Sequence, residues 1–100
     1  MTDAAHTCPA CNGAGEILTM HHPIVCLLCN ETGEVDSATL SRWREGRAFR
    51  DRRVERGLGL NEIQHMTRGK WTALMVSNME RGLDPQGIPP EAWAWVGGRP

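Results

Sequence analysis

The stretch Cys8-Pro-Ala-Cys11-Asn-Gly-Ala-Gly15-Glu-Ile17 is repeated 18 residues further on as Cys26-Leu-Leu-Cys29-Asn-Glu-Thr-Gly33-Glu-Val35. Two residues between a pair of cysteines allow both thiolates of a tight turn to face one ion. The glycines that follow each pair permit the positive backbone torsion that turns the chain back. The repeated unit is therefore typical of a zinc knuckle.

Two such knuckles, about 14 residues apart, supply four sulfurs for one ion. We expect the intervening segment to hold two strands, at residues 16–20 and 23–25. Four thiolates leave no open coordination position, so the metal would contribute folding energy and no catalysis. The predicted cofactor is one structural Zn²⁺ held by Cys8, Cys11, Cys26 and Cys29.

The CxxCxGxG form of the first copy, with its altered second copy, resembles the cysteine-rich repeats of DnaJ-type chaperones. The resemblance covers about a quarter of the chain, and the second copy departs from it because Glu31 stands where the first glycine would be. It implies zinc binding more strongly than chaperone activity.

Other interpretations of the cysteines stay open at this stage. They could be buried thiols or two disulfides, although a reducing compartment favours metal binding. A redox-active pair is disfavoured because no thioredoxin-like alternation of strand and helix surrounds either motif. His6, His21 or His22 could replace one cysteine, but four well-spaced cysteines make this unnecessary.

Charge divides the chain into two parts. Residues 1–41 contain five acidic residues and no Lys or Arg, whereas residues 42–100 contain 11 basic and seven acidic residues, a net charge of +4. Such asymmetry is typical of a chain with one part that meets a polyanion. No signal peptide or membrane span is expected, so we predict a cytoplasmic protein without a membrane partner.

Beyond residue 36 the pattern changes to short amphipathic helices. Asp36 or Ser37 can cap a helix over residues 37–45, which Gly46 would break, and further helices are expected at 47–56, 61–66, 72–81 and 91–96. The predicted fold is thus a small zinc-bound β-hairpin and knuckle module, followed by an all-α helix-turn-helix domain of four to five short helices. We expect three parts: the zinc-binding module at residues 1–36, a helical connector at 37–46, and the helix-turn-helix domain at 47–100.

Residues 46 to 60, Gly-Arg-Ala-Phe-Arg-Asp-Arg-Arg-Val-Glu-Arg-Gly-Leu-Gly-Leu, resemble the opening of the Xre or lambda-repressor-like helix-turn-helix family. The later signature of that family, a capped recognition helix before Glu-Arg-Gly, is matched by residues 72–79 and Glu80-Arg81-Gly82. The resemblance covers residues 46–96. Gln64, where the family has a small alanine, and an altered turn before Thr72 depart from it.

The resemblance implies that a recognition helix enters the major groove of double-stranded DNA. It makes Ala73, Leu74, Ser77 and Asn78 the candidates that face the bases. Phosphate contacts are then implied for Arg56, Arg68, Lys70, Thr72 and Arg81. It also suggests a homodimer, with the zinc hairpin and residues 93–96 as the candidate dimer surfaces.

We therefore expect a transcriptional regulator of the repressor type, whose zinc module serves dimerisation or binds a protein partner. A zinc module followed by an Xre-like domain is also the layout of MqsA-type antitoxins, so a phage, plasmid or antitoxin protein is one reading. The alternative is an adaptor or inhibitor of a host factor that retains the scaffold without DNA binding. No nucleophile with a base, paired carboxylates or phosphate loop is present, and we expect no enzyme.

Overall fold

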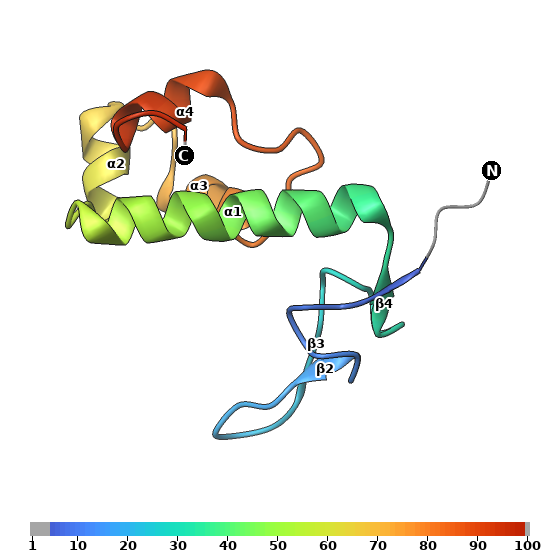
Figure 1. The fold of residues 1–100 in the computed structure, drawn as a ribbon. Coiled ribbons are helices and arrows are strands. Elements are labelled where there is room, and N and C mark those ends of the chain that lie inside the picture. The colour runs from blue at the N-terminus through green and yellow to red at the C-terminus, as the bar shows by residue number, and fades with distance from the viewer. Residues whose placement is uncertain (1–4, 100) are drawn as a thin grey trace. The chain divides into compact units, whose positions relative to one another are not determined.

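A computed structural model describes residues 5–99 of the chain. Small β-hairpins with a four-cysteine cluster come first and four helices follow, which confirms the predicted fold class (Figure 1). The backbone forms two compact units, Met1–Ser41 and Arg42–Pro100, which are described separately below. Residues 1–4 and 100 lie outside the described part, and so do the corresponding ends of the predicted ranges 1–36 and 47–100.

The first unit contains two antiparallel strand pairs of two residues each. β1 (His6–Thr7) pairs with β4 (Glu34–Val35), and β2 (Glu16–Ile17) pairs with β3 (Ile24–Val25). The inner pair was predicted, although with longer strands. The outer pair was not predicted, because two residues are too few to show the alternation that marks a strand.

Helix α1 (Ser37–Glu55) begins where predicted, because the Asp36 carboxylate accepts a hydrogen bond of 2.7 Å from the backbone N–H of Thr39. The predicted break at Gly46 is wrong, since the helix runs through this residue without interruption. Gly46 is buried, and a Cβ atom there would lie 2.7 Å from the carbonyl carbon of Glu80. The glycine therefore permits close packing of two backbones and does not end the helix.

Replacing Gly46 by alanine tests this packing. In an exposed helix the change would stabilise the protein by about 0.5–1 kcal/mol. Here we expect a loss of about 1–3 kcal/mol, because the methyl group overlaps the backbone of residues 79 and 80. Chemical denaturation measures the difference, with Arg44→Ala at an exposed position of the same helix as the control. A stabilised Gly46→Ala protein would contradict the close approach.

The second unit has its own hydrophobic core. Besides the part of α1 from Arg42 onward, it contains α2 (Leu60–Met66), α3 (Ala73–Glu80) and α4 (Pro90–Trp95). The Phe49 and Trp93 rings pack edge to face at a centroid distance of 5.4 Å. The other buried core residues are Ile63, Val76, Met79, Ile88, Ala92 and Val96. Within the predicted dimer surface at residues 93–96, Trp93 and Val96 are therefore packed inside this unit, whereas Ala94 is exposed and Trp95 is half-buried.

Among the helices of the described part, none combines the length and apolar composition that a membrane crossing requires. The longest, α1, carries charged residues throughout its second half.

Candidate metal centre

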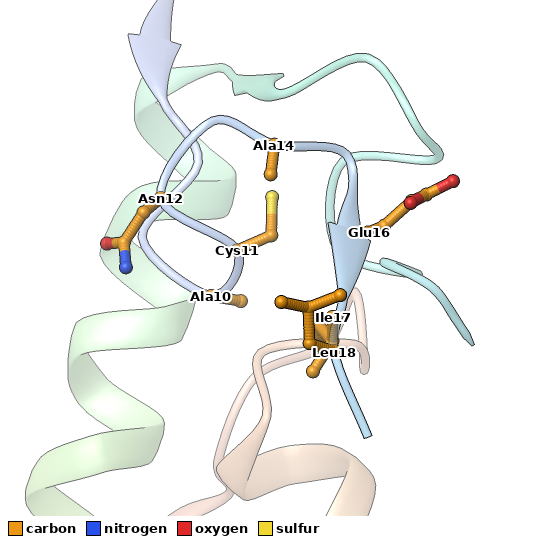
Figure 2. A pocket seen from close by; sticks show the side chains of 7 residues that line it. All are labelled: Ala10, Cys11, Asn12, Ala14, Glu16, Ile17 and Leu18. Atoms are coloured by element: carbon orange, nitrogen blue, oxygen red, sulfur yellow. The ribbon is translucent and has the colours of Figure 1, made fainter. Parts of the chain in front are cut away.

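The two knuckles fold as near copies of each other. Figure 2 shows the loop of the first knuckle around Cys11. In this knuckle the Gly13 N–H donates to the Cys8 carbonyl and the Ala14 N–H donates to the Cys11 carbonyl. In the second, Glu31 and Thr32 make the matching bonds to Cys26 and Cys29. Each knuckle thus presents two thiols from one tight turn, as the sequence repeat predicts.

The knuckles are also joined to each other by matching hydrogen bonds. The Cys8 N–H donates to the Gly33 carbonyl at 2.9 Å, and the Cys26 N–H donates to the Gly15 carbonyl at 3.1 Å. The first and third cysteines are thereby held at the ends of the strand pairs. These links were not predicted, because a spacing pattern describes each knuckle alone and not how two knuckles face each other.

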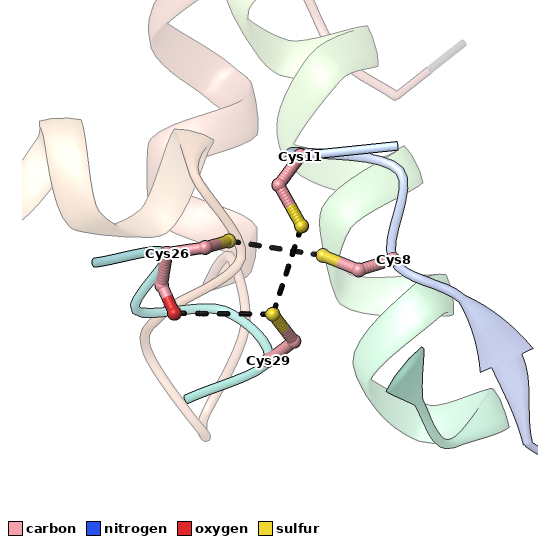
Figure 3. Close-up of side chains that lie close together, drawn as sticks. All are labelled: Cys8, Cys11, Cys26 and Cys29. Carbon is pink, nitrogen blue, oxygen red and sulfur yellow. Dashed lines mark hydrogen bonds between the residues drawn. The ribbon is translucent and has the colours of Figure 1, made fainter. Parts of the chain in front are cut away.

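The four sulfurs converge on one point, as Figure 3 shows. The Sγ atoms of Cys8 and Cys26 are 3.8 Å apart, those of Cys11 and Cys29 are 3.7 Å apart, and all four lie within 4.8 Å of one another. Zinc–sulfur bonds of about 2.3 Å in a tetrahedron place neighbouring sulfurs about 3.8 Å apart. A disulfide needs about 2.05 Å. The cluster therefore fits one metal ion, for which zinc is the best match, and does not contain disulfides.

Burial and local hydrogen bonds set the acidity of the metal-free thiols. Burial raises the pKa of Cys8 to about 12 and also raises that of Cys26. Burial acts in the same direction at Cys11, but the Gly15 N–H, 3.2 Å from Sγ, and the other thiols outweigh it and lower the pKa of Cys11 to about 7. The Gly15 N–H also gives this ligand an outer hydrogen bond of the kind that orients metal ligands.

Glycines let the two knuckles approach closely. Gly15 has φ +80°, and a Cβ atom there would lie 2.6 Å from the carbonyl oxygen of Glu31. Gly33 has φ +78° and meets the backbone of Gly13 in the same way. Glu31, which departs from the glycine pattern, still adopts φ +71°. The second knuckle therefore keeps the shape of the first, with a strained backbone conformation at Glu31.

A Gly15→Ala chain should bind zinc at least tenfold more weakly, which is about 1.4 kcal/mol, because the added methyl group pushes the knuckles apart. Competition with a chelator measures the affinity. Gly87→Ala is the matched control, since Gly87 has φ +72° but no atom within 4 Å of the added Cβ. Equal zinc affinity in both variants would show that the knuckles do not touch at Gly15.

The three histidines of the first unit stay outside the cluster. His6 Nε2 lies 3.0 Å from the Ser37 hydroxyl, and His21 and His22 are exposed in the loop between β2 and β3. Within the described residues, the metal-ligating group consists of cysteines alone.

All the candidate DNA contacts except Arg56 lie on α3 or in the segments that adjoin it. Val76 and Met79 face the core, while Leu74 is 69% exposed and Ala73, Ser77 and Asn78 are half-buried. Thr72 caps the helix by accepting a hydrogen bond from the Met75 N–H. Arg68, Lys70 and Arg81 are exposed near the two ends of α3, and Arg56 is exposed just after α1.

Two side chains that position α3 were missed. Glu80 is buried and forms a paired contact with Arg53, with Nε–Oε2 at 2.7 Å and Nη2–Oε1 at 3.0 Å. Gln64 Oε1 accepts a hydrogen bond of 3.0 Å from the Ala73 N–H. Gln64 thus joins α2 to the start of α3.

Comparison of the chain with protein-family models, with curated proteins and with solved structures finds no match. Fold and site together define a class: a protein with a cluster of four buried cysteines placed to hold one metal ion, followed by a helical region. Any more particular assignment rests on the residues themselves.

Proposed function

We propose that the chain is a sequence-specific DNA-binding regulator of the repressor type. In this proposal residues 46–96 form an Xre-like helix-turn-helix domain and the metal centre stabilises a separate module for dimerisation or a protein partner. The observation that carries the proposal is α3, which is anchored by Val76 and Met79 and presents a polar and apolar strip on its other side.

The strip has the chemistry needed to read base edges. Ser77 and Asn78 carry hydroxyl and amide groups that hydrogen-bond to bases in the major groove, and Ala73 and Leu74 are suited to a thymine methyl group. Ser77 and Asn78 are half-buried and lie outside the buried core.

Basic side chains flank the strip and would hold phosphates. Arg68 and Arg81 are exposed, and the Lys70 ammonium forms an exposed ion pair of 3.3 Å with Glu91. Such a pair contributes little to stability and opens readily when a phosphate competes for the lysine. The second unit is net positive, whereas the first unit would be repelled by DNA because it contains no Lys or Arg.

One observation favours the second candidate function, a protein-binding adaptor without DNA binding. Leu74 and Met75 are 69% and 42% exposed, and α3 contains no basic residue. An exposed apolar pair on a surface helix suits a protein groove as well as a thymine methyl. The two functions differ in their response to salt.

Selection of genomic fragments by the zinc-loaded chain across a salt series distinguishes them. A regulator should enrich short palindromes and lose affinity steeply as salt rises. The Ser77→Ala/Asn78→Ala double variant should lose about 1–3 kcal/mol for each base contact removed. Ser41→Ala, at an exposed position of α1, is the matched control. An absence of enrichment even at low salt would overturn the regulator and leave the adaptor.

A further inference from the structure

The outer edge of β2 is an exposed surface that the metal centre does not use. Within the described residues, β2 has β3 as its strand neighbour on one side and no strand on the other. In an antiparallel pair only alternate residues bond to the partner strand, so the outer side of β2 retains backbone groups that can pair with a further strand.

A hollow of about 270 Å³ lies beside this edge (Figure 2). It is lined by the first knuckle, through Ala10, Cys11, Asn12 and Ala14, and by β2 with the residue that follows it, through Glu16, Ile17 and Leu18. Most of its wall is apolar, and Leu18 at its rim is 82% exposed. The hollow is therefore suited to an apolar side chain from a partner.

The two faces of β2 have different chemistry. Figure 2 shows Ile17 turned toward Ala10, while the carboxylate of Glu16, which also lines the hollow, extends to the opposite side of the strand. Successive residues of a strand face opposite sides, so a strand added to this edge would place alternate side chains in the hollow and beside Glu16. An apolar residue suits the first position, and Lys or Arg suits the second.

We propose that the outer edge of β2, with its hollow, binds an extended segment of another protein in which basic and apolar residues alternate. Backbone pairing with β2 would supply affinity, and the two side-chain positions would supply specificity. This interface rests on the proposed function, since it identifies the kind of partner that the metal-binding unit would take.

Charge argues for a basic partner and against a second copy of the same edge. The first 41 residues contain only acidic charges, and the zinc–thiolate centre adds negative charge. Two copies paired through β2 would bring Glu16 near Glu16 of the other copy, and like charges on adjacent strands are destabilising. A segment with Lys or Arg reverses the sign of this interaction.

Synthetic peptides that alternate Lys with Val or Ile provide the probe, and peptides with Glu in place of Lys provide its charge-reversed match. Fluorescence anisotropy with the full zinc-loaded chain should show binding of the Lys peptides and not of the Glu peptides. Leu18→Asn and Glu16→Lys should each weaken binding by about tenfold or more. Val54→Asn, a 54% exposed residue of the second unit, is the control and should change nothing.

Three outcomes overturn the interface: no binding of Lys peptides, equal binding of both peptide sets, or binding that Leu18→Asn leaves unchanged. Self-association of the chain that Leu18→Asn abolishes also overturns it, because a second copy would then occupy the edge. Leu18→Asn lies outside the helical unit and changes no charge, so the DNA affinity of this variant should stay as in the parent chain. Loss of the interface with DNA binding intact therefore leaves the proposed regulator standing.

Discussion

Replacement of Cys26 by serine is expected to unfold the first unit and to leave the second folded. Apart from the cysteines, the buried core of the first unit consists of Val35, with only a few partly buried side chains around it. Such a core is too small to hold a fold, whereas a structural zinc ion contributes about 10–16 kcal/mol of apparent binding energy. Bound zinc should fall from one ion per chain to none.

Nuclear magnetic resonance spectra of the amides, together with metal analysis, measure this result. Amide signals of residues 5–36 should collapse to unfolded positions, while those from the core around Phe49 and Trp93 should stay dispersed. His22→Ala is the control, because His22 is an exposed candidate ligand outside the cluster. Zinc loss in His22→Ala, or a folded first unit in Cys26→Ser, would show that the ligand set is wrong.

Truncation of Glu80 to alanine is expected to cost about 3–5 kcal/mol of folding stability in the second unit. The Arg53 and Glu80 side chains are only 11% and 5% exposed, so the variant leaves a guanidinium buried without its carboxylate. The Arg53 Nη1 bond of 2.9 Å to the Leu58 carbonyl satisfies only part of that charge. Denaturant unfolding of the single variant measures the loss.

A double replacement distinguishes the loss of the ion pair from the loss of packing. Arg53→Met combined with Glu80→Leu should regain most of the stability, since an apolar pair of similar volume removes the uncompensated charge. Glu91→Ala, which breaks the exposed pair with Lys70, should change stability by no more than about 1 kcal/mol. Equal effects at Glu80 and Glu91 would contradict a buried ion pair.

The metal cluster could be predicted from the sequence because its chemistry is local. A Cys-x-x-Cys spacing with glycines after it describes one knuckle almost completely, and the repeat supplies the second. The close approach of the Gly15 and Glu31 backbones could not be predicted, since it depends on pairing between segments 16 residues apart. The same holds for the pairing of β1 with β4, because these strands are far apart in the sequence of the unit.

In the helical unit, local signals predicted the starts and stops of the short helices better than their contacts. Gly46 illustrates the limit, because glycine is read as a helix breaker unless the tertiary structure needs a missing side chain. Gln64 and Glu80 show the same limit for polar residues. Both are polar residues on helices, and their roles appear only when Ala73 and Arg53 are brought beside them.

The central claim, that α3 reads DNA, is tested most directly by titrating the zinc-loaded chain with the selected duplex, or at low salt with short genomic fragments, while recording amide chemical shifts. The account predicts that the largest changes fall on residues 72–78, with smaller ones at Arg68, Lys70 and Arg81 and none at the four cysteines. Shifts confined to the first unit, or no shifts at α3 under any salt condition, would contradict it.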